Sequence, residues 1–150
     1  MKYKTAEIKM LLVRETENTI GAVDRPERIV RYWNEVIAGS SWYTPDKEQV
    51  VVVALDTKFN PIGFNLVSMG TVNETMCHPR DVFRPAIHMN ATSVVLIHNH
   101  PSGDPAPSAA DFRLTRAIKE AGELLRVNLT DHIVVGNGSL YYSFRESGIV

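Results

Sequence analysis

The sequence predicts an α/β fold in which helices cover both faces of a central mixed β-sheet, giving three layers, α/β/α. Two continuous apolar runs rich in β-branched residues, at 50–55 and 93–97, are typical of strands buried on both faces. Segments with apolar residues at helical spacing precede, separate and follow these runs, so helices and strands alternate along the chain.

Length and composition favour one domain over residues 1–150, with a core at 24–150 and residues 1–23 as an N-terminal strand or arm. A chain of this size buries enough surface to fold without a disulfide or a partner. The single cysteine, Cys77, excludes an internal disulfide and disfavours a cysteine-based zinc site. The formal net charge of -1 does not imply a DNA partner, and nothing indicates the oligomeric state.

The N-terminal residues do not resemble a targeting or membrane segment. The apolar run from Met10 to Val13 is too short for a signal sequence or a membrane span. We therefore expect a cytoplasmic protein with no membrane partner. Residues 6–15 alternate enough to form a first strand, and an arm is equally compatible with them.

The first helix is expected to begin near Asp24, which can act as its N-cap. Pro26 suits a first helical turn, and Glu27 stands three residues after the cap. Gly39 is a natural stop. The apolar face that defines this helix consists of Ile29, Trp33, Val36 and Ile37.

The second half of the chain alternates in the same way. Pro85 is unfavourable inside a helix, so the helix after Pro79 should begin late or bend at that position. The expected elements are strands at 50–55, 62–69 and 93–97, the helix after 79, a stiff proline-containing loop at 101–107, a helix from Ser108, and a hairpin of 128–135 with 140–144.

A metal site is indicated where the strand at 93–97 ends. His98 and His100 stand two residues apart on extended chain, so their side chains point to the same side. A bare pair of this kind is also compatible with a polar loop start. The stiff loop that follows can fold the next helix back, so that Asp111 faces both imidazoles; otherwise Asp111 simply caps that helix. Three such ligands with an open fourth position are typical of catalytic zinc, although iron and other transition metals are compatible too.

These motifs resemble a known family. The His-x-His-Pro string followed by Ser-x-x-Asp resembles the JAMM motif of JAB/MPN+ metalloproteins, and the longer strings resemble its bacterial RadC branch. The strings that carry the resemblance are 98–105 (HNHPSGDP), 78–83 (HPRDVF), 108–111 (SAAD) and 131–136 (DHIVVG). The adjacent His-Asn-His letters are not the motif of an HNH nuclease, which spreads its residues over a ββα unit.

The resemblance implies a cytidine-deaminase-like fold, one zinc ion per chain, and metal-dependent hydrolysis of a peptide or isopeptide bond. RadC proteins carry a DNA-repair label whose biochemical basis the resemblance does not establish. Longer members have an N-terminal helix-hairpin-helix region, for which we expect no room in this chain. A peptide or protein substrate is therefore the partner that we expect, rather than DNA.

The resemblance also implies residue roles. The hydroxyl of Ser108 would stabilise the oxyanion, besides capping its helix. The family uses a glutamate as general base, and we expect its position at Asn65, which cannot accept a proton. Glu74 is a candidate replacement, although a solvated loop charge explains it better. Glu48 and Asp104 are weaker candidates.

Three further residues are expected behind the ligands. Asn99 lies between the two histidines and would hold the loop. Asp131 and His132 would support the metal ligands by hydrogen bonds, or form a satisfied pair in the core. Two functions remain open: a zinc-dependent hydrolase, or a zinc-binding domain that is catalytically weak because of Asn65 and serves in binding or DNA-repair assembly.

Overall fold

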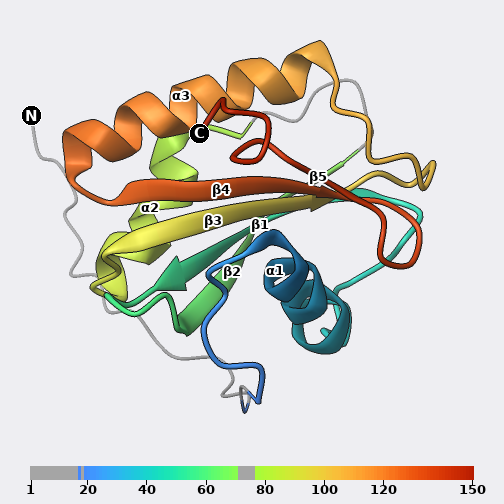
Figure 1. The fold of residues 1–150 in the computed structure, drawn as a ribbon, viewed down its shortest axis with the longest axis horizontal. Coiled ribbons are helices and arrows are strands. Elements are labelled where there is room, and N and C mark those ends of the chain that lie inside the picture. Colours follow the sequence, from blue (N-terminus) through green and yellow to red (C-terminus); the bar gives the residue numbers. More distant parts are fainter. Residues whose placement is uncertain (1–16, 18, 71–76) are drawn as a thin grey trace, which may run out of the picture.

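The computed structural model describes residues 17, 19–70 and 77–150, which form a mixed sheet covered by helices on both faces (Figure 1). The strand order is β2-β1-β3-β4-β5, with β3 and β4 parallel and the other neighbours antiparallel. In chain order the elements are α1 (Pro26–Tyr32), the π-helix η1 (Trp33–Ile37), β1 (Glu48–Leu55), β2 (Pro61–Gly70), α2 (Pro79–His88), β3 (Ser93–Asn99), α3 (Ala109–Leu125), β4 (Asn128–Val135) and β5 (Tyr141–Ser143).

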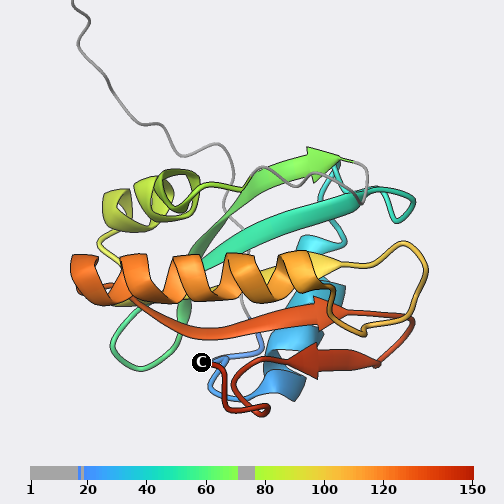
Figure 2. The same ribbon diagram turned by 90° about the horizontal axis from the view of Figure 1, so that it is seen from above.

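The sheet has a helical layer on each side, which confirms the predicted three-layer α/β/α fold. Figure 2 shows α3 crossing one face of the sheet, with α1 beyond the opposite face. One apolar cluster lies between the sheet and α1–η1, and a second joins the sheet to α2 and α3. Every residue of β1 and β3 is buried, as the two apolar runs predicted.

Alternation along the central strands decides which side faces the site. Val51 and Val53 belong to the cluster on the α1 side, whereas Val50 and Val52 belong to the cluster on the α3 side. His98 is the register partner of Val50 in the antiparallel β1–β3 pair, so its side chain points to the α3 side. The start of α3 therefore lies over the end of β3 that carries the histidines.

The prediction that Asp24 caps the first helix is wrong. Arg25 is the N-cap and makes no side-chain cap bond, and Pro26 is the first helical residue. The Asp24 carboxylate instead accepts a hydrogen bond from Arg28 Nη1 at 3.2 Å. Arg28, one turn along the helix, thus binds the carboxylate that would otherwise cap the helix.

The helix after residue 78 does not begin late, and it continues through the internal proline at which we expected a late start or a bend. α2 starts at Pro79, where a missing backbone N–H costs nothing, and continues through Pro85 to His88. Pro85 is buried and its carbonyl accepts from the Met89 N–H at 3.0 Å. Packing against the core therefore outweighs the local preference to interrupt the helix.

The packed core includes a residue before position 24. Val23, which we expected in the N-terminal strand or arm, is 1% exposed and belongs to the cluster on the α1 side. Its backbone N–H donates to the Phe59 carbonyl at 2.9 Å. The expected strand at 6–15 lies outside the described residues. Within the described part of the chain, no helix is long and apolar enough to cross a membrane.

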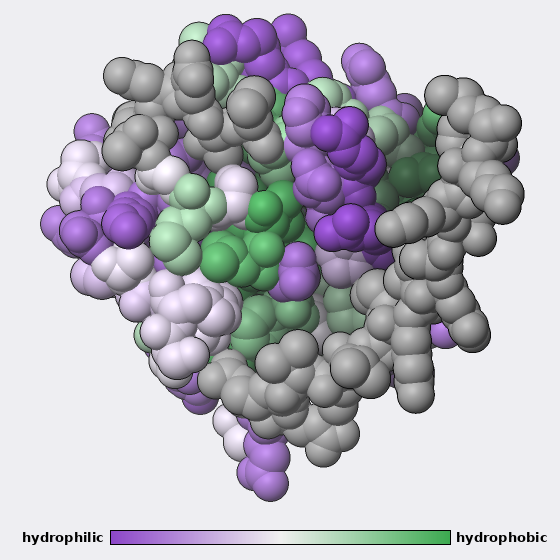
Figure 3. Space-filling view, turned by 180° about the vertical axis from the view of Figure 1, so that it is seen from behind, coloured by the Kyte–Doolittle hydropathy of each residue, from purple (hydrophilic) through white to green (hydrophobic). Residues whose placement is uncertain are grey.

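Seen from behind, the molecule carries an apolar area bordered by hydrophilic residues (Figure 3). Large apolar side chains that stay partly exposed include Ile62 (43%) and Met69 (40%) on β2 and Ile87 (50%) on α2. Scattered apolar exposure is ordinary for folded proteins, so it does not by itself indicate a binding site.

The loop between β3 and α3 is held against the β4–β5 turn. His100 N–H donates to the Val135 carbonyl at 3.1 Å, and the Asn137 N–H donates to the Gly103 carbonyl at 3.0 Å. Gly136 allows this approach, because a Cβ there would lie 2.4 Å from the Gly103 carbonyl oxygen. The position of the loop thus depends on a backbone contact that tolerates no side chain.

We expect Gly136→Ala to destabilise the protein by about 1–3 kcal/mol, because the added methyl group must displace the loop at Gly103. Chemical denaturation of the variant and the wild type measures this difference. Gly39→Ala is the matched control, since a Cβ at Gly39 meets only ordinary contacts at 3.6 Å or more. Equal stability of the Gly136 variant and the wild type would contradict the close approach.

Candidate metal centre

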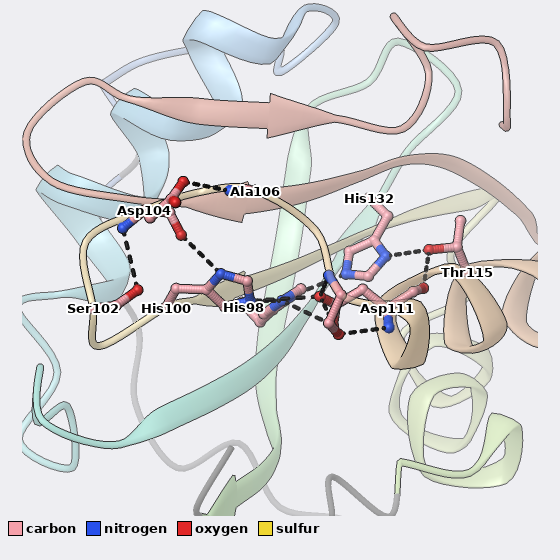
Figure 4. A network of polar contacts seen from close by, with 9 residues as sticks. His98, His100, Ser102, Asp104, Ala106, Asp111, Thr115 and His132 are labelled. Atoms are coloured by element: carbon pink, nitrogen blue, oxygen red, sulfur yellow. Dashed lines mark hydrogen bonds and ion pairs between the residues drawn. The ribbon is translucent and has the colours of Figure 1, made fainter. Parts of the chain in front are cut away.

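Three potential ligands from β3 and α3 converge on one point (Figure 4). The Nε2 atom of His98 lies 3.1 Å from Nε2 of His100 and 3.2 Å from Oδ1 of Asp111. His100 Nε2 lies 3.5 Å from Oδ2 of Asp111. The ligand atoms of all three residues lie within 4.8 Å of one another. The structure therefore brings together the three residues that the sequence singled out as ligands.

A chain of hydrogen bonds determines which nitrogen of His98 carries a proton. The Thr115 hydroxyl donates its one proton to the Asp111 carbonyl at 2.6 Å, so it can only accept from His132 Nδ1, also at 2.6 Å. Burial lowers the pKa of His132 well below its usual value and keeps it neutral. Its Nε2 therefore accepts from His98 Nδ1 at 2.8 Å, which leaves a lone pair on His98 Nε2.

His100 is oriented by the loop that follows it. Its Nδ1 donates to the Asp104 carbonyl at 2.9 Å, so its Nε2 also presents a lone pair to the site. The Asp104 carboxylate accepts from the Ala106 N–H at 2.9 Å and braces the loop. Asp104 thus contributes through its backbone oxygen, and its carboxylate is not part of the converging group.

Asp111 is held by the start of its own helix. Ser108 and Asp111 form a capping box, in which the Ser108 hydroxyl accepts from the Asp111 N–H at 3.2 Å. Asp111 Oδ2 accepts from the Ser108 N–H at 2.7 Å and from its hydroxyl at 2.8 Å. Burial would raise the pKa of Asp111, but its contacts with His100 and His98 hold it well below its usual range. The carboxylate is therefore charged, with Oδ1 directed at His98.

This arrangement suits a cation. Without a metal, a proton on an imidazole Nε2 joins the nitrogens of His98 and His100 to the Asp111 carboxylate at 3.1–3.5 Å, and a metal ion would take the place of that proton. Each imidazole already donates its other N–H elsewhere, as metal-bound histidines usually do. The His-His-Asp group is therefore positioned to bind a metal ion, and its mixed nitrogen and oxygen donors fit a transition metal better than calcium or magnesium.

A cavity of about 160 Å³ opens beside the three ligands. Glu48, at the start of β1, lines it and is 6% exposed. The hydrogen bond to Asp111 raises the pKa of His100, burial opposes the increase, and the charge of Glu48 adds to it. A second carboxylate is thus close enough to act electrostatically on the site. The other lining residues are Val50, His98, His100, Pro101, Ser102, Ser108, Ala110, Asp111 and Leu114.

The structure does not bring the expected base position to this cavity. Asn65 lies exposed on β2, opposite Val52, and is not among the lining residues. Glu74 lies outside the described residues. Glu48, ranked below Glu74 from the sequence, is the carboxylate that the described chain places beside the ligands.

The remaining predicted residues lie behind the site. The Asn99 side chain binds the backbone of Lys47, just before β1, and of Gln49 on β1. Asp131 accepts from the Ser143 hydroxyl at 2.7 Å and from the backbone N–H groups of Arg145 and His132. Burial raises its pKa. Asp131, which precedes His132 on β4, therefore ties the end of the β4–β5 hairpin to β4.

The sequence analysis missed one residue of the site, Thr115, and ranked another, Glu48, too low. Thr115 was missed, although a threonine one helical turn after Asp111 on the buried face of a helix is a usable signal. Glu48 precedes the apolar run by two residues, at the same side as Val50, which is also a signal. Its place opposite the histidines depends on the pairing of β1 with β3, which no local pattern reveals.

Fold and site together define a JAB-type domain with a His-His-Asp group positioned to bind a metal ion. The RadC-like JAB domain family matches residues 23–149, and the chain belongs to this family. A protein of Thermotoga maritima, called UPF0758 protein, is 44% identical over 95% of this chain and 61% of its own length. Proteins of the same name from Trichlorobacter lovleyi and Methanococcoides burtonii are 47% and 40% identical over 69% and 85% of the chain. The chain spans about half of the length of these two relatives, 45% and 56%.

His132→Phe should weaken metal binding by about 10- to 100-fold, because His98 Nδ1 loses its acceptor and the ring orientation is released. Phenylalanine keeps the stacking on Phe144, whose ring centroid lies 4.8 Å away. Calorimetric titration with zinc measures the affinity. Thr115→Ser is the matched control, since it keeps the hydroxyl and should bind within about threefold of the wild type. An unchanged affinity in the phenylalanine variant would exclude the tautomer argument.

Metal affinity should fall as the pH is lowered. Since the pKa of His100 is raised, a proton occupies its Nε2 below that value and must leave when a metal binds. Asp111 stays ionised because its pKa is lowered, so it adds no further proton in this range. Below the His100 pKa we expect about a tenfold loss of affinity per pH unit. Titrations in buffers of different ionisation enthalpy count the released protons, and a pH-independent affinity with no proton release would contradict this.

Proposed function

We propose that the chain is a zinc-dependent hydrolase that cleaves an amide bond of a peptide or protein, either a peptide or an isopeptide bond. One observation carries the proposal: Glu48 shares a cavity with the His98, His100 and Asp111 group. A metal with an open position needs a neighbouring base to activate water. The cavity has a carboxylate, Glu48, beside the residues that would hold the metal. Membership of the RadC-like JAB family supports the same class of chemistry.

The ligand set favours zinc. Three protein ligands, two imidazoles and one carboxylate, leave the fourth tetrahedral position free, as catalytic zinc sites do. When bound there, zinc lowers the pKa of water and polarises a carbonyl group. The cavity beside the ligands has room for the reacting group of a substrate.

Glu48, rather than Asn65 or Glu74, is the general base in this proposal. Its carboxylate accepts the proton that water loses on attacking the carbonyl carbon and delivers it to the leaving nitrogen. The exposed Asn65 on β2 has no part in the reaction. The departure from the family pattern that we expected at position 65 therefore gives no reason to doubt catalysis.

The Ser108 hydroxyl has two alternative acceptors, Asp111 Oδ2 and the carbonyl oxygen of a substrate. Its hydroxyl donates to Asp111 Oδ2 at 2.8 Å, and its backbone N–H donates to the same oxygen at 2.7 Å. Asp111 thus stays held if the hydroxyl turns into the cavity, which Ser108 lines. There it would donate to the carbonyl oxygen as negative charge develops on it.

The catalytically weak alternative rested on a missing carboxylate. Glu48 removes that reason, because it places a carboxylate beside the proposed metal ligands. A domain that binds zinc tightly and cleaves no amide bond would support the alternative role in binding or assembly.

The test combines metal content with hydrolysis. Purified wild type should hold about one zinc per chain by elemental analysis, and His98→Ala and Asp111→Ala should lose it. Glu48→Gln should keep the zinc and lose about 10²–10⁴-fold in kcat on a substrate selected from peptide and isopeptide libraries. The isosteric amide cannot accept a proton, so the metal site stays intact while the base is lost.

Asn65→Ala is the control, and it should retain wild-type zinc content and kcat because the side chain is exposed and outside the cavity. Full activity in Glu48→Gln would remove Glu48 from the mechanism. Full zinc content in both ligand variants would refute the site itself.

A further inference from the structure

The sheet opens between β1 and β3 at the site. The β1–β3 register ends with Val50 opposite His98. Beyond that pair, β1 stays joined to β2, where Glu48 lies opposite Gly70. His100, on the other side, stays joined to β4 through its N–H bond to the Val135 carbonyl at 3.1 Å. The two strands separate where Glu48 and His100 would face each other, and the cavity lies there.

One side chain bridges this opening. The Asn99 carboxamide oxygen accepts from the Gln49 N–H at 2.9 Å, and its nitrogen donates to the Lys47 carbonyl at 2.9 Å. The two backbone partners, one a donor and one an acceptor, determine the orientation of the amide. Asn99 thus offers the same donor and acceptor as the peptide group that the opened ladder lacks.

Asn99 contacts the backbone on both sides of the proposed base, Glu48. Its two contacts are on the residues before and after Glu48, so both peptide groups next to Glu48 are held by Asn99. Asn99 itself lies between the two histidine ligands on the chain and is 5% exposed. The segment that carries the metal ligands therefore also holds the backbone that carries the carboxylate.

We propose that Asn99 is a positioning residue that sets Glu48 against the metal ligands across the opened sheet. This inference rests on the proposed function of Glu48. Only a side chain with both a donor and an acceptor at this length makes the two bonds. Aspartate lacks the donor for Lys47, and alanine lacks both.

The structural part of the test uses hydrogen exchange of the metal-free protein. In Asn99→Ala the Gln49 amide should exchange at least about tenfold faster, because its acceptor is gone. Asn99→Asp keeps that acceptor, so its Gln49 amide should stay protected. Zinc affinity should stay within about threefold in both variants. Unchanged exchange at Gln49 in Asn99→Ala would overturn the proposal.

The functional part separates positioning from general loosening. We expect Asn99→Ala to lower kcat by about 10- to 100-fold with KM within about twofold, because a misplaced carboxylate affects the reaction step and not substrate binding. In the Glu48→Gln background the same change should cost no more than about twofold, since the group it positions is already absent. Losses that multiply in the double variant would overturn the proposal.

Asn60→Ala is the matched control. The Asn60 amide also braces β1, but at its other end, where it donates to the Asp56 carboxylate at 3.0 Å. The Asn60→Ala variant should be somewhat less stable than the wild type, with unchanged kcat, zinc affinity and exchange of the Gln49 amide. A loss of kcat equal to that of Asn99→Ala would mean that loosening alone explains the effect.

A wild type without hydrolytic activity would refute the proposed function. The positioning role of Asn99 is then tested by the absorption spectrum of a bound metal ion. With Co²⁺ in place of zinc, visible absorption bands report on the surroundings of the ion. Asn99→Ala and Glu48→Gln should change these bands in the same way, and the double variant should add nothing. Bands that change in Glu48→Gln but not in Asn99→Ala would overturn the positioning role by themselves.

Discussion

The site depends on three ligand atoms that the fold holds close together. Two imidazole Nε2 atoms lie 3.1 Å apart, and each can bind a metal once it carries no proton, because the Nδ1 atoms donate elsewhere. The Asp111 carboxylate adds a negative charge to the same point. The surrounding structure holds this arrangement in place, and a cation would stabilise it where a proton does so in the metal-free site.

The surrounding structure restricts each donor by a different route. The buried pair of His132 and Thr115 orients His98 from the sheet and from α3. The backbone of the proline-containing loop orients His100, and a capping box orients Asp111. Thr115 connects two of these routes, since it also bonds the Asp111 carbonyl. Movement of α3 relative to the sheet would therefore disturb two ligands together.

The cavity lies where the sheet is incomplete. The ladder between β1 and β3 has ended there, and the β3–α3 loop and the start of α3 form the rest of its lining. An opened edge exposes backbone groups that need partners. The Asn99 amide provides them, which allows a polar cavity to be built into the middle of a sheet at little cost in unsatisfied hydrogen bonds.

The sequence by itself determined the local features of this protein: the two buried central strands, the histidine pair on one side of the chain, and the Ser108–Asp111 cap. These follow from side-chain periodicity and from contacts within a few residues, which the order of residues specifies. Tertiary structure alone decided that Glu48 rather than Asn65 faces the histidines, that His132 and Thr115 act through His98, and that Asp24 serves Arg28 instead of a helix end. Strand register and helix packing join residues tens of positions apart, and a shift of one residue in register would reverse which side chains reach the site.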